Sequence, residues 1–141
     1  MAIIATGVAT LGGLGWWWTR ERPTPALTLR LDVDAATAAA APDVLTARRG
    51  DGVTAEARGA ATMWVFSGDA LVATCGTTRC ARHGSILNLT FVPRTTGRYR
   101  VVAVAGQSWE PPPGGFDRAI AFARLHRLTI ELRSVDVRAA P

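Results

Sequence analysis

The only two cysteines of the chain, Cys75 and Cys80, are the residues whose type and spacing most directly suggest chemistry. Four residues separate them. A loop of that length closes with a disulfide if the two Cα atoms come within about 7 Å. Such a bond persists in an oxidising compartment. The spacing therefore predicts a disulfide between Cys75 and Cys80, with two free thiols as the alternative.

A zinc site is a second use of the same residues, because His83 follows Cys80 closely and thiolates and imidazoles are ligands that zinc prefers. His126 is the one other histidine that could join it. The spacing of the cysteines is loose for zinc and no second cysteine pair exists, so we expect no metal and no cofactor. The chain also lacks a phosphate-binding glycine loop, a paired-carboxylate site and a nucleophile elbow. We therefore expect a protein that is not an enzyme.

The segment from Gly106 to Gly115 is the candidate surface for a protein partner. Its residue types predict a stiff extended loop that carries a large aromatic ring: Trp109, Pro111, Pro112 and Pro113. Loops at the end of a domain vary without disturbing the core, and a tryptophan held in a rigid segment offers apolar contact area at little entropic cost. The alternative is that Trp109 covers the core beneath the loop.

The elements that must position these residues are mainly β-strands. Apolar and polar residues alternate in several segments, and others are rich in β-branched and aromatic residues. These patterns predict strands at residues 27–33, 44–47, 53–58, 62–66, 70–75, 86–92, 98–105 and 128–137. Residues 35–41 and 76–84 are expected to be loops, and a change of apolar face at Arg133 and Ser134 predicts a bulge. Helical spacing over residues 117–126 predicts one short amphipathic helix lying flat on the sheets.

Three short motifs resemble those of an immunoglobulin-like β-sandwich. Gly97 and Tyr99 are similar to the start of its sixth strand, where the tyrosine hydroxyl ties back to the preceding loop. Residues 49–52 ahead of Val53 resemble the approach to the second strand of bacterial immunoglobulin-like domains, and Trp64 stands where the buried tryptophan of the third strand is expected. The resemblance implies an antiparallel sandwich of about seven strands over residues 27–141.

The N-terminal part of the chain has the features of a membrane anchor. Residues 2–18 carry no charge and end in aromatic and basic residues suited to the headgroup boundary: Trp16, Trp17, Trp18, Arg20 and Arg22. We expect a transmembrane helix over residues 1–19, in contact with membrane lipid, and a stalk over 20–26. A cleaved secretory signal is the alternative, but the start lacks a basic residue and bulky residues occupy the place of a cleavage site.

Small residues recur at four-residue intervals within this anchor, at Ala5, Ala9 and Gly13. Such a stripe lets two membrane helices approach closely, so a homodimer through this face is a further expectation.

The net charge of +5 comes from 16 basic residues, all arginine, that are interleaved with acidic ones. This distribution lacks the basic stripe of a nucleic-acid interface, and we expect no nucleic-acid partner. Arg20, Arg22 and Arg30 after the anchor favour a cytoplasmic domain, whereas a paired Cys75 and Cys80 favour the opposite side. We expect the extracytoplasmic side.

An anchor followed by such a domain is similar to the extracytoplasmic portions of bacterial single-pass regulatory and envelope proteins. This resemblance implies a non-enzymatic interaction or sensing module at the bacterial envelope. The alternative function is a cysteine-based redox or zinc-binding protein that uses Cys75, Cys80 and His83.

Overall fold

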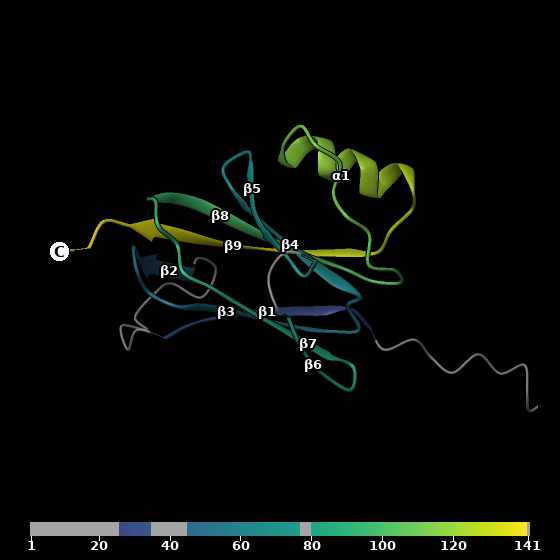
Figure 1. The fold of residues 1–141 in the computed structure, drawn as a ribbon, viewed down its shortest axis with the longest axis horizontal. Helices are drawn as coiled ribbons and strands as arrows, with labels where there is room; N and C mark the ends of the chain where they lie inside the picture. Colours follow the sequence, from purple (N-terminus) through teal and green to yellow (C-terminus); the bar gives the residue numbers. More distant parts are fainter. Residues whose placement is uncertain (1–25, 35–44, 77–79, 141) are drawn as a thin grey trace, which may run out of the picture.

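Two stacked β-sheets and one helix make up the part of the chain that the computed structural model describes, residues 26–34, 45–76 and 80–140 (Figure 1). The elements follow in the order β1 (Thr28–Val33), β2 (Leu45–Arg48), β3 (Val53–Arg58), β4 (Thr62–Ser67), β5 (Ala70–Thr74), β6 (Ala81–His83), β7 (Ile86–Phe91), β8 (Gly97–Val104), α1 (Phe116–Leu125) and β9 (Ile130–Arg138). The expectation of a mainly β chain with a short helix before the last strand is confirmed.

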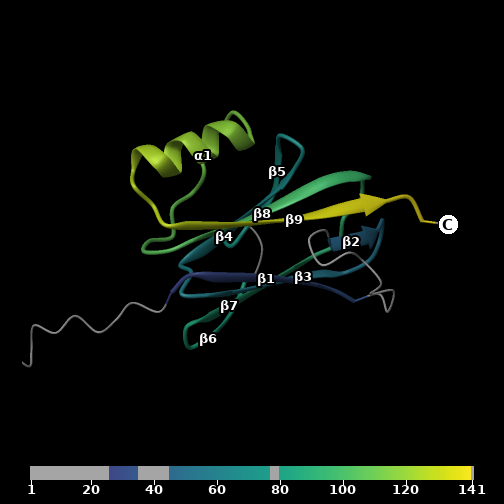
Figure 2. The same cartoon turned by 180° about the vertical axis from the view of Figure 1, so that it is seen from behind.

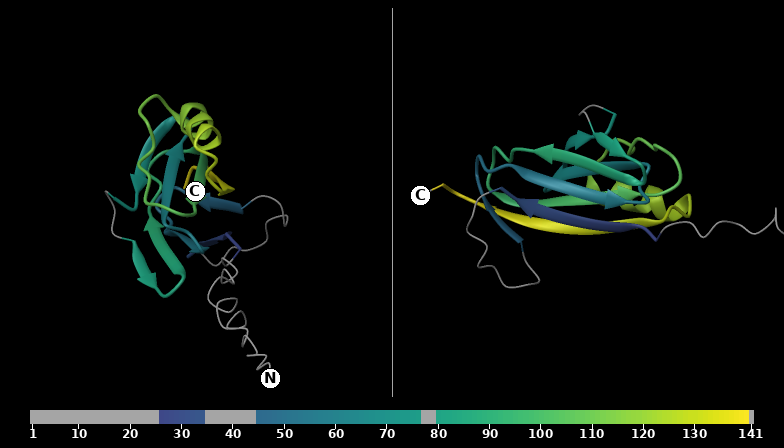
Figure 3. Two further views of the ribbon diagram at one scale, coloured as in Figure 1. Left: turned by 90° about the vertical axis from the view of Figure 1, so that its right-hand side faces the viewer. Right: turned by 90° about the horizontal axis from the view of Figure 1, so that it is seen from below.

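The strand order is consistent with an immunoglobulin-like sandwich. One sheet has four strands in the order β1-β3-β7-β6, and the other has five in the order β2-β9-β8-β4-β5. All neighbours pair antiparallel except β2, which runs parallel to β9. The sheets form two layers, and α1 lies on the far side of the five-stranded sheet (Figures 2 and 3). The expectation that residues 76–84 form a loop is wrong in part, because they include β6, which pairs with β7.

Strand β4, which lies between β8 and β5 in the five-stranded sheet, is buried on both faces. Met63 and Val65 point into the space between the sheets. Trp64 and Phe66 point the other way and pack with Phe116 of α1. Because successive side chains of a strand alternate in direction, β4 is a continuous apolar run rather than an alternating one.

Trp64 is fully buried, as the resemblance to the third strand of an immunoglobulin-like domain implies. Its position differs from that pattern, however. It belongs to the cluster beneath α1, whereas the buried tryptophan of immunoglobulin domains packs against the bond that joins the two sheets. The helix layer therefore supplies the apolar environment of Trp64.

The prediction of a bulge in the last strand is wrong. The pairing of β8 with β9 runs without a shift from Gly97 opposite Val137 to Val104 opposite Ile130. Val135 is buried between the sheets, whereas Ile130 packs against the cluster beneath α1. The apolar face changes because different layers cover the two ends of one regular strand.

The helix α1 lies on the outer face of the five-stranded sheet, as expected (Figure 1). Ala119 and Ala123 are fully buried against the sheet. Phe116 meets Phe66 edge-on at 5.4 Å between ring centroids, and the Arg100 guanidinium lies 3.6 Å above the Phe116 ring. Gly115 precedes the helix with a φ of 98°, which favours glycine, and a Cβ there would lie only 3.2 Å from the Asp69 side chain. These contacts hold the start of α1 against the β4–β5 turn.

Tyr99 ties the start of β8 to the loop before it, which confirms the expected tyrosine motif. Its hydroxyl lies 2.8 Å from the Thr95 hydroxyl and 3.3 Å from the Thr95 backbone nitrogen, which donates to it. Burial of the ring raises the pKa of the Tyr99 hydroxyl, but hydrogen bonds from Thr95 and Ser67 outweigh this and leave the pKa lower than usual.

We expect Tyr99→Phe to lower the free energy of unfolding by about 1 kcal/mol, because the ring stays in place while its hydrogen bonds to Thr95 are lost. Urea unfolding checks this. Thr95→Val removes only the partner hydroxyl, so the double variant must lose less than the two single losses added together. If the losses in free energy of unfolding were additive, the Tyr99–Thr95 hydrogen bond would not contribute to stability.

The anchor, the stalk before residue 26 and the loop at residues 35–41 lie outside the described residues, and so do Trp16, Trp17, Trp18, Arg20, Arg22, Ala5, Ala9 and Gly13. Within residues 26–34, 45–76 and 80–140, no helix has the length and apolarity to cross a membrane.

Candidate functional site

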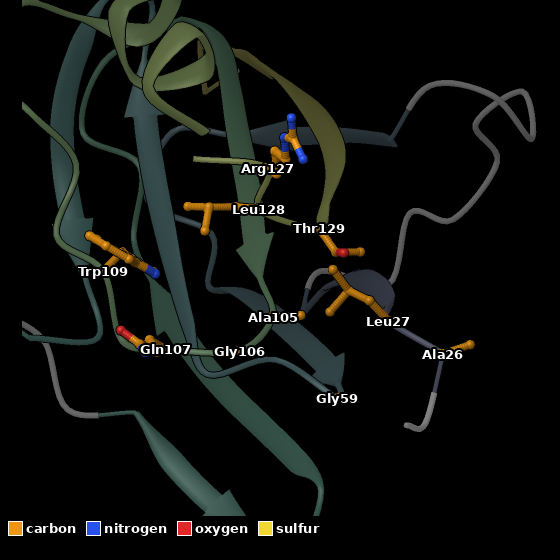
Figure 4. A pocket seen from close by; sticks show the side chains of 10 residues that line it. All are labelled: Ala26, Leu27, Gly59, Ala105, Gly106, Gln107, Trp109, Arg127, Leu128 and Thr129. Carbon is orange, nitrogen blue, oxygen red and sulfur yellow. The ribbon is translucent and has the colours of Figure 1, made fainter. Parts of the chain in front are cut away.

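An open pocket of about 580 Å³ lies at one end of the sandwich (Figure 4). Its walls come from the start of β1, the β3–β4 turn, the segment after β8 and the segment between α1 and β9. We call it the end pocket and define it by its lining: Ala26, Leu27, Gly59, Ala105, Gly106, Gln107, Trp109, Arg127, Leu128 and Thr129. Trp109 lies across the pocket from Ala26 and Leu27, and Leu128 points toward Trp109 (Figure 4).

Trp109 is held at the pocket wall by contacts on both its backbone and its ring. The Trp64 indole N–H donates a 2.9 Å hydrogen bond to the Trp109 carbonyl, and the Trp109 N–H donates to the Gln107 carbonyl at 2.8 Å. The Trp109 ring meets Phe122 at 5.6 Å and His126 at 5.1 Å between centroids. The side chain is half-buried. Trp109 therefore covers the core beneath α1, which was the alternative weighed from the sequence, and it also lines the end pocket.

Arg127 reaches the end pocket from the C-terminal end of α1. After the last helical residue, the Arg127 N–H donates to the Arg124 carbonyl and the Leu128 N–H donates to the Ala123 carbonyl at 2.9 Å. This pair of bonds is a Schellman motif, which places its C′ residue in the left-handed region and usually has glycine there. Arg127 occupies that position with a φ of 54°, and it is the only non-glycine residue with positive φ among the described residues.

The polar side chains of the end pocket can each donate a hydrogen bond, and no side chain of its lining carries a negative charge. Arg127 contributes a guanidinium, Gln107 an amide and Thr129 a hydroxyl, and none of the lining residues is Asp or Glu. The apolar part of the wall comes from Leu27, Leu128 and the Trp109 ring. This combination suits a ligand that has both an anionic group and an apolar portion.

Cys75 and Cys80 form the expected disulfide, with their Cα atoms 5.2 Å apart. The bond connects the end of β5 in the five-stranded sheet to the residue before β6 in the four-stranded sheet. Both cysteines are half-buried against the core between the sheets. The carboxylate of Glu110 lies against Gly76, so the loop after β8 reaches this corner.

The structure does not bring the two histidines to the cysteines as one site. His83 is exposed on β6, while His126 follows α1 and lies beside Phe122, with 4.3 Å between ring centroids. The disulfide occupies both sulfur atoms. Among the described residues, no group of three or more His, Cys, Asp or Glu side chains has the arrangement to hold a metal ion.

The three prolines of the loop after β8 lie outside the end pocket. Pro111 and Pro112 are half-buried and Pro113 is exposed, and the lining of the pocket stops at Trp109 on this side. A role for these prolines and for Trp109 in binding a protein partner stays a prediction.

Sequence reasoning did not find Leu27, Arg127 or Leu128 as site residues. Leu27 belongs to a regular alternating strand, and an arginine after a helix is a common way to complement its C-terminal partial charge. The one available signal was that an arginine, not a glycine, stands at residue 127 after the helix. It acquires meaning only when the left-handed backbone of Arg127 is known.

No family model matches the sequence, and comparisons with curated proteins and with solved structures give no significant match.

Proposed function

We propose that the chain is a non-enzymatic interaction or sensing module of a bacterial envelope, held in the membrane by residues 1–19 with the sandwich outside the cytoplasm. The end pocket is the observation that carries the binding role. It is open, and its lining combines apolar side chains with the Arg127 guanidinium. The aromatic residue Trp109 is already held in place without a ligand. A contact surface that is ordered in advance loses less entropy on binding.

The disulfide supports the extracytoplasmic placement. Bonds of this kind form and persist in oxidising compartments and are rare where thiols are kept reduced. Cys75 and Cys80 are paired at a corner where the two sheets are joined, which is a structural use of the bond.

Expression of the full chain in a bacterial host tests the placement. We expect the protein in the membrane fraction, its domain digested by protease added to intact spheroplasts, and its cysteines resistant to alkylation until they are reduced. A variant lacking residues 2–19 should leave the membrane fraction. Protection of the domain in intact spheroplasts would overturn the extracytoplasmic assignment.

A photo-crosslinking side chain at Ser108 tests the interaction surface, because Ser108 precedes Trp109 and is exposed. The matched control is the same side chain at Thr96, an exposed position in the turn at the opposite end of the sandwich. We expect a discrete adduct from position 108 in cells and none from position 96. Equal adducts, or none from position 108, would argue against a binding role for this end.

The redox or zinc-binding alternative makes the opposite prediction for the same preparation. Its zinc-binding form requires reduced Cys75 and Cys80 and zinc retained in stoichiometric amount, which intact-protein mass measurement detects.

A further inference from the structure

We propose that the end pocket binds the phosphate of an anionic phospholipid headgroup, with Arg127 and Trp109 as the recognising residues. The proposal rests on the membrane-anchored binding module above and names the ligand class of its pocket.

Two donors of the end pocket lack a partner among the residues that the structure describes. Within the described residues, neither the Arg127 guanidinium nor the Trp109 indole N–H makes a hydrogen bond or an ion pair. A guanidinium matches two oxygens of a phosphate in a planar arrangement, and an indole N–H in an amphipathic setting seeks a polar partner. Both residues line the end pocket, so a phosphate bound there is the partner that we assign to both groups.

Arg127 occupies a backbone position that glycine would adopt at lower cost. Its φ of 54° is unfavourable for any residue with a Cβ, and the Schellman motif that places it there favours glycine. Retention of a strained residue at a pocket is a recognised mark of a functional position. The guanidinium gives arginine at residue 127 a function that glycine lacks.

The position of the end pocket favours a lipid over free phosphate. Ala26 and Leu27 form one wall, so the pocket lies where the chain enters the domain. Seven residues lie between Ala26 and Trp18, the last residue of the tryptophan triplet, and even a fully extended chain spans at most about 29 Å over these eight steps. If the triplet lies at the headgroup boundary, the pocket is within reach of headgroups. Leu27, Leu128 and the Trp109 ring then face the less polar part of the lipid.

Titration of the full chain in nonionic micelles with dihexanoyl phosphatidylglycerol tests the proposal. The readout is the indole N–H resonance of Trp109 in a nitrogen–proton NMR spectrum, assigned by its disappearance in Trp109→Phe. We expect this resonance to shift in a saturable way with dihexanoyl phosphatidylglycerol and not with the zwitterionic dihexanoyl phosphatidylcholine. No shift, or equal shifts with the two lipids, would overturn the proposal. A saturable shift with inorganic phosphate at the same concentrations would assign the pocket to free phosphate and overturn the lipid assignment.

Arg127→Gly separates a binding role from a structural one. We expect it to weaken phosphatidylglycerol binding at least tenfold and to raise the melting temperature by about 2–4 °C, because glycine suits the left-handed backbone. Arg127→Lys keeps the charge but loses the planar pair of donors, so we expect it to weaken binding, though by less than Arg127→Gly does. Arg94→Gln removes one positive charge from the exposed turn between β7 and β8 and should leave binding unchanged.

Binding by Arg127→Gly at the wild-type level would overturn the proposal. Because micelle titration requires neither membrane insertion nor sidedness, its failure is distinguishable from failure of the spheroplast experiment.

Discussion

Replacement of Trp64 by alanine is expected to lower the free energy of unfolding by about 3–5 kcal/mol, the largest effect of any single substitution considered for this protein. Trp64 is fully buried beneath α1, where it packs with Phe66, Phe116 and Ala119. Alanine leaves a cavity between the helix and the sheet, and it also removes the donor to the Trp109 carbonyl. Urea unfolding of the full chain in nonionic detergent measures the loss.

Trp64→Phe separates the two contributions. It keeps an aromatic ring in the cluster but deletes the N–H that binds the Trp109 carbonyl at 2.9 Å, so we expect a smaller loss of about 1–3 kcal/mol. Trp109→Phe is the matched substitution at a half-buried ring. It should lower the free energy of unfolding by less than Trp64→Ala does. A loss below about 1 kcal/mol for Trp64→Ala would contradict the packing of α1 on the sheet.

Loss of the Cys75–Cys80 disulfide is expected to lower the free energy of unfolding by about 2 kcal/mol. The two cysteines are 5 positions apart, and a short loop constrains the unfolded chain less than a long one does. The double variant Cys75→Ser, Cys80→Ser and the reduced wild-type protein should lose similar amounts in urea unfolding.

The double variant also serves as the control for the reductant, which should leave its stability unchanged. If reduction of the wild-type protein left its free energy of unfolding unaltered while alkylation showed that the thiols were free, a stabilising role of the bond would be excluded. A disulfide that forms only after purification would point instead to the cysteine-based alternative function.

Local pattern was enough to predict most strands and the disulfide. In β1 and β3, apolar and polar residues alternate, and the structure places their apolar sides between the sheets. The hairpin of β4 and β5 could be predicted because turn residues separate two apolar runs, and the spacing of Cys75 and Cys80 allowed them to pair. Tyr99 could be placed because a local motif joins it to the loop only four residues before it.

Neighbours distant in sequence decided the features that were missed. A two-residue period indicates that side chains alternate between faces, but it does not indicate which layer covers each face. Trp64 faces α1, which begins about fifty residues later, and the change of apolar face in β9 reflects coverage by two layers rather than a bulge. The pairing of β6 with β7 likewise depends on the adjacent sheet.

The sequence by itself determined the mainly β architecture, the short helix and the pairing of the cysteines, because each depends on residues close together in the chain. Only the tertiary structure decided the end pocket. Its walls come from residues 26–27, 59, 105–109 and 127–129, and no local pattern indicates that these four segments meet. The physical reason is that the position of α1 on the sheet sets where Trp109 and Arg127 lie, and packing between layers determines that position.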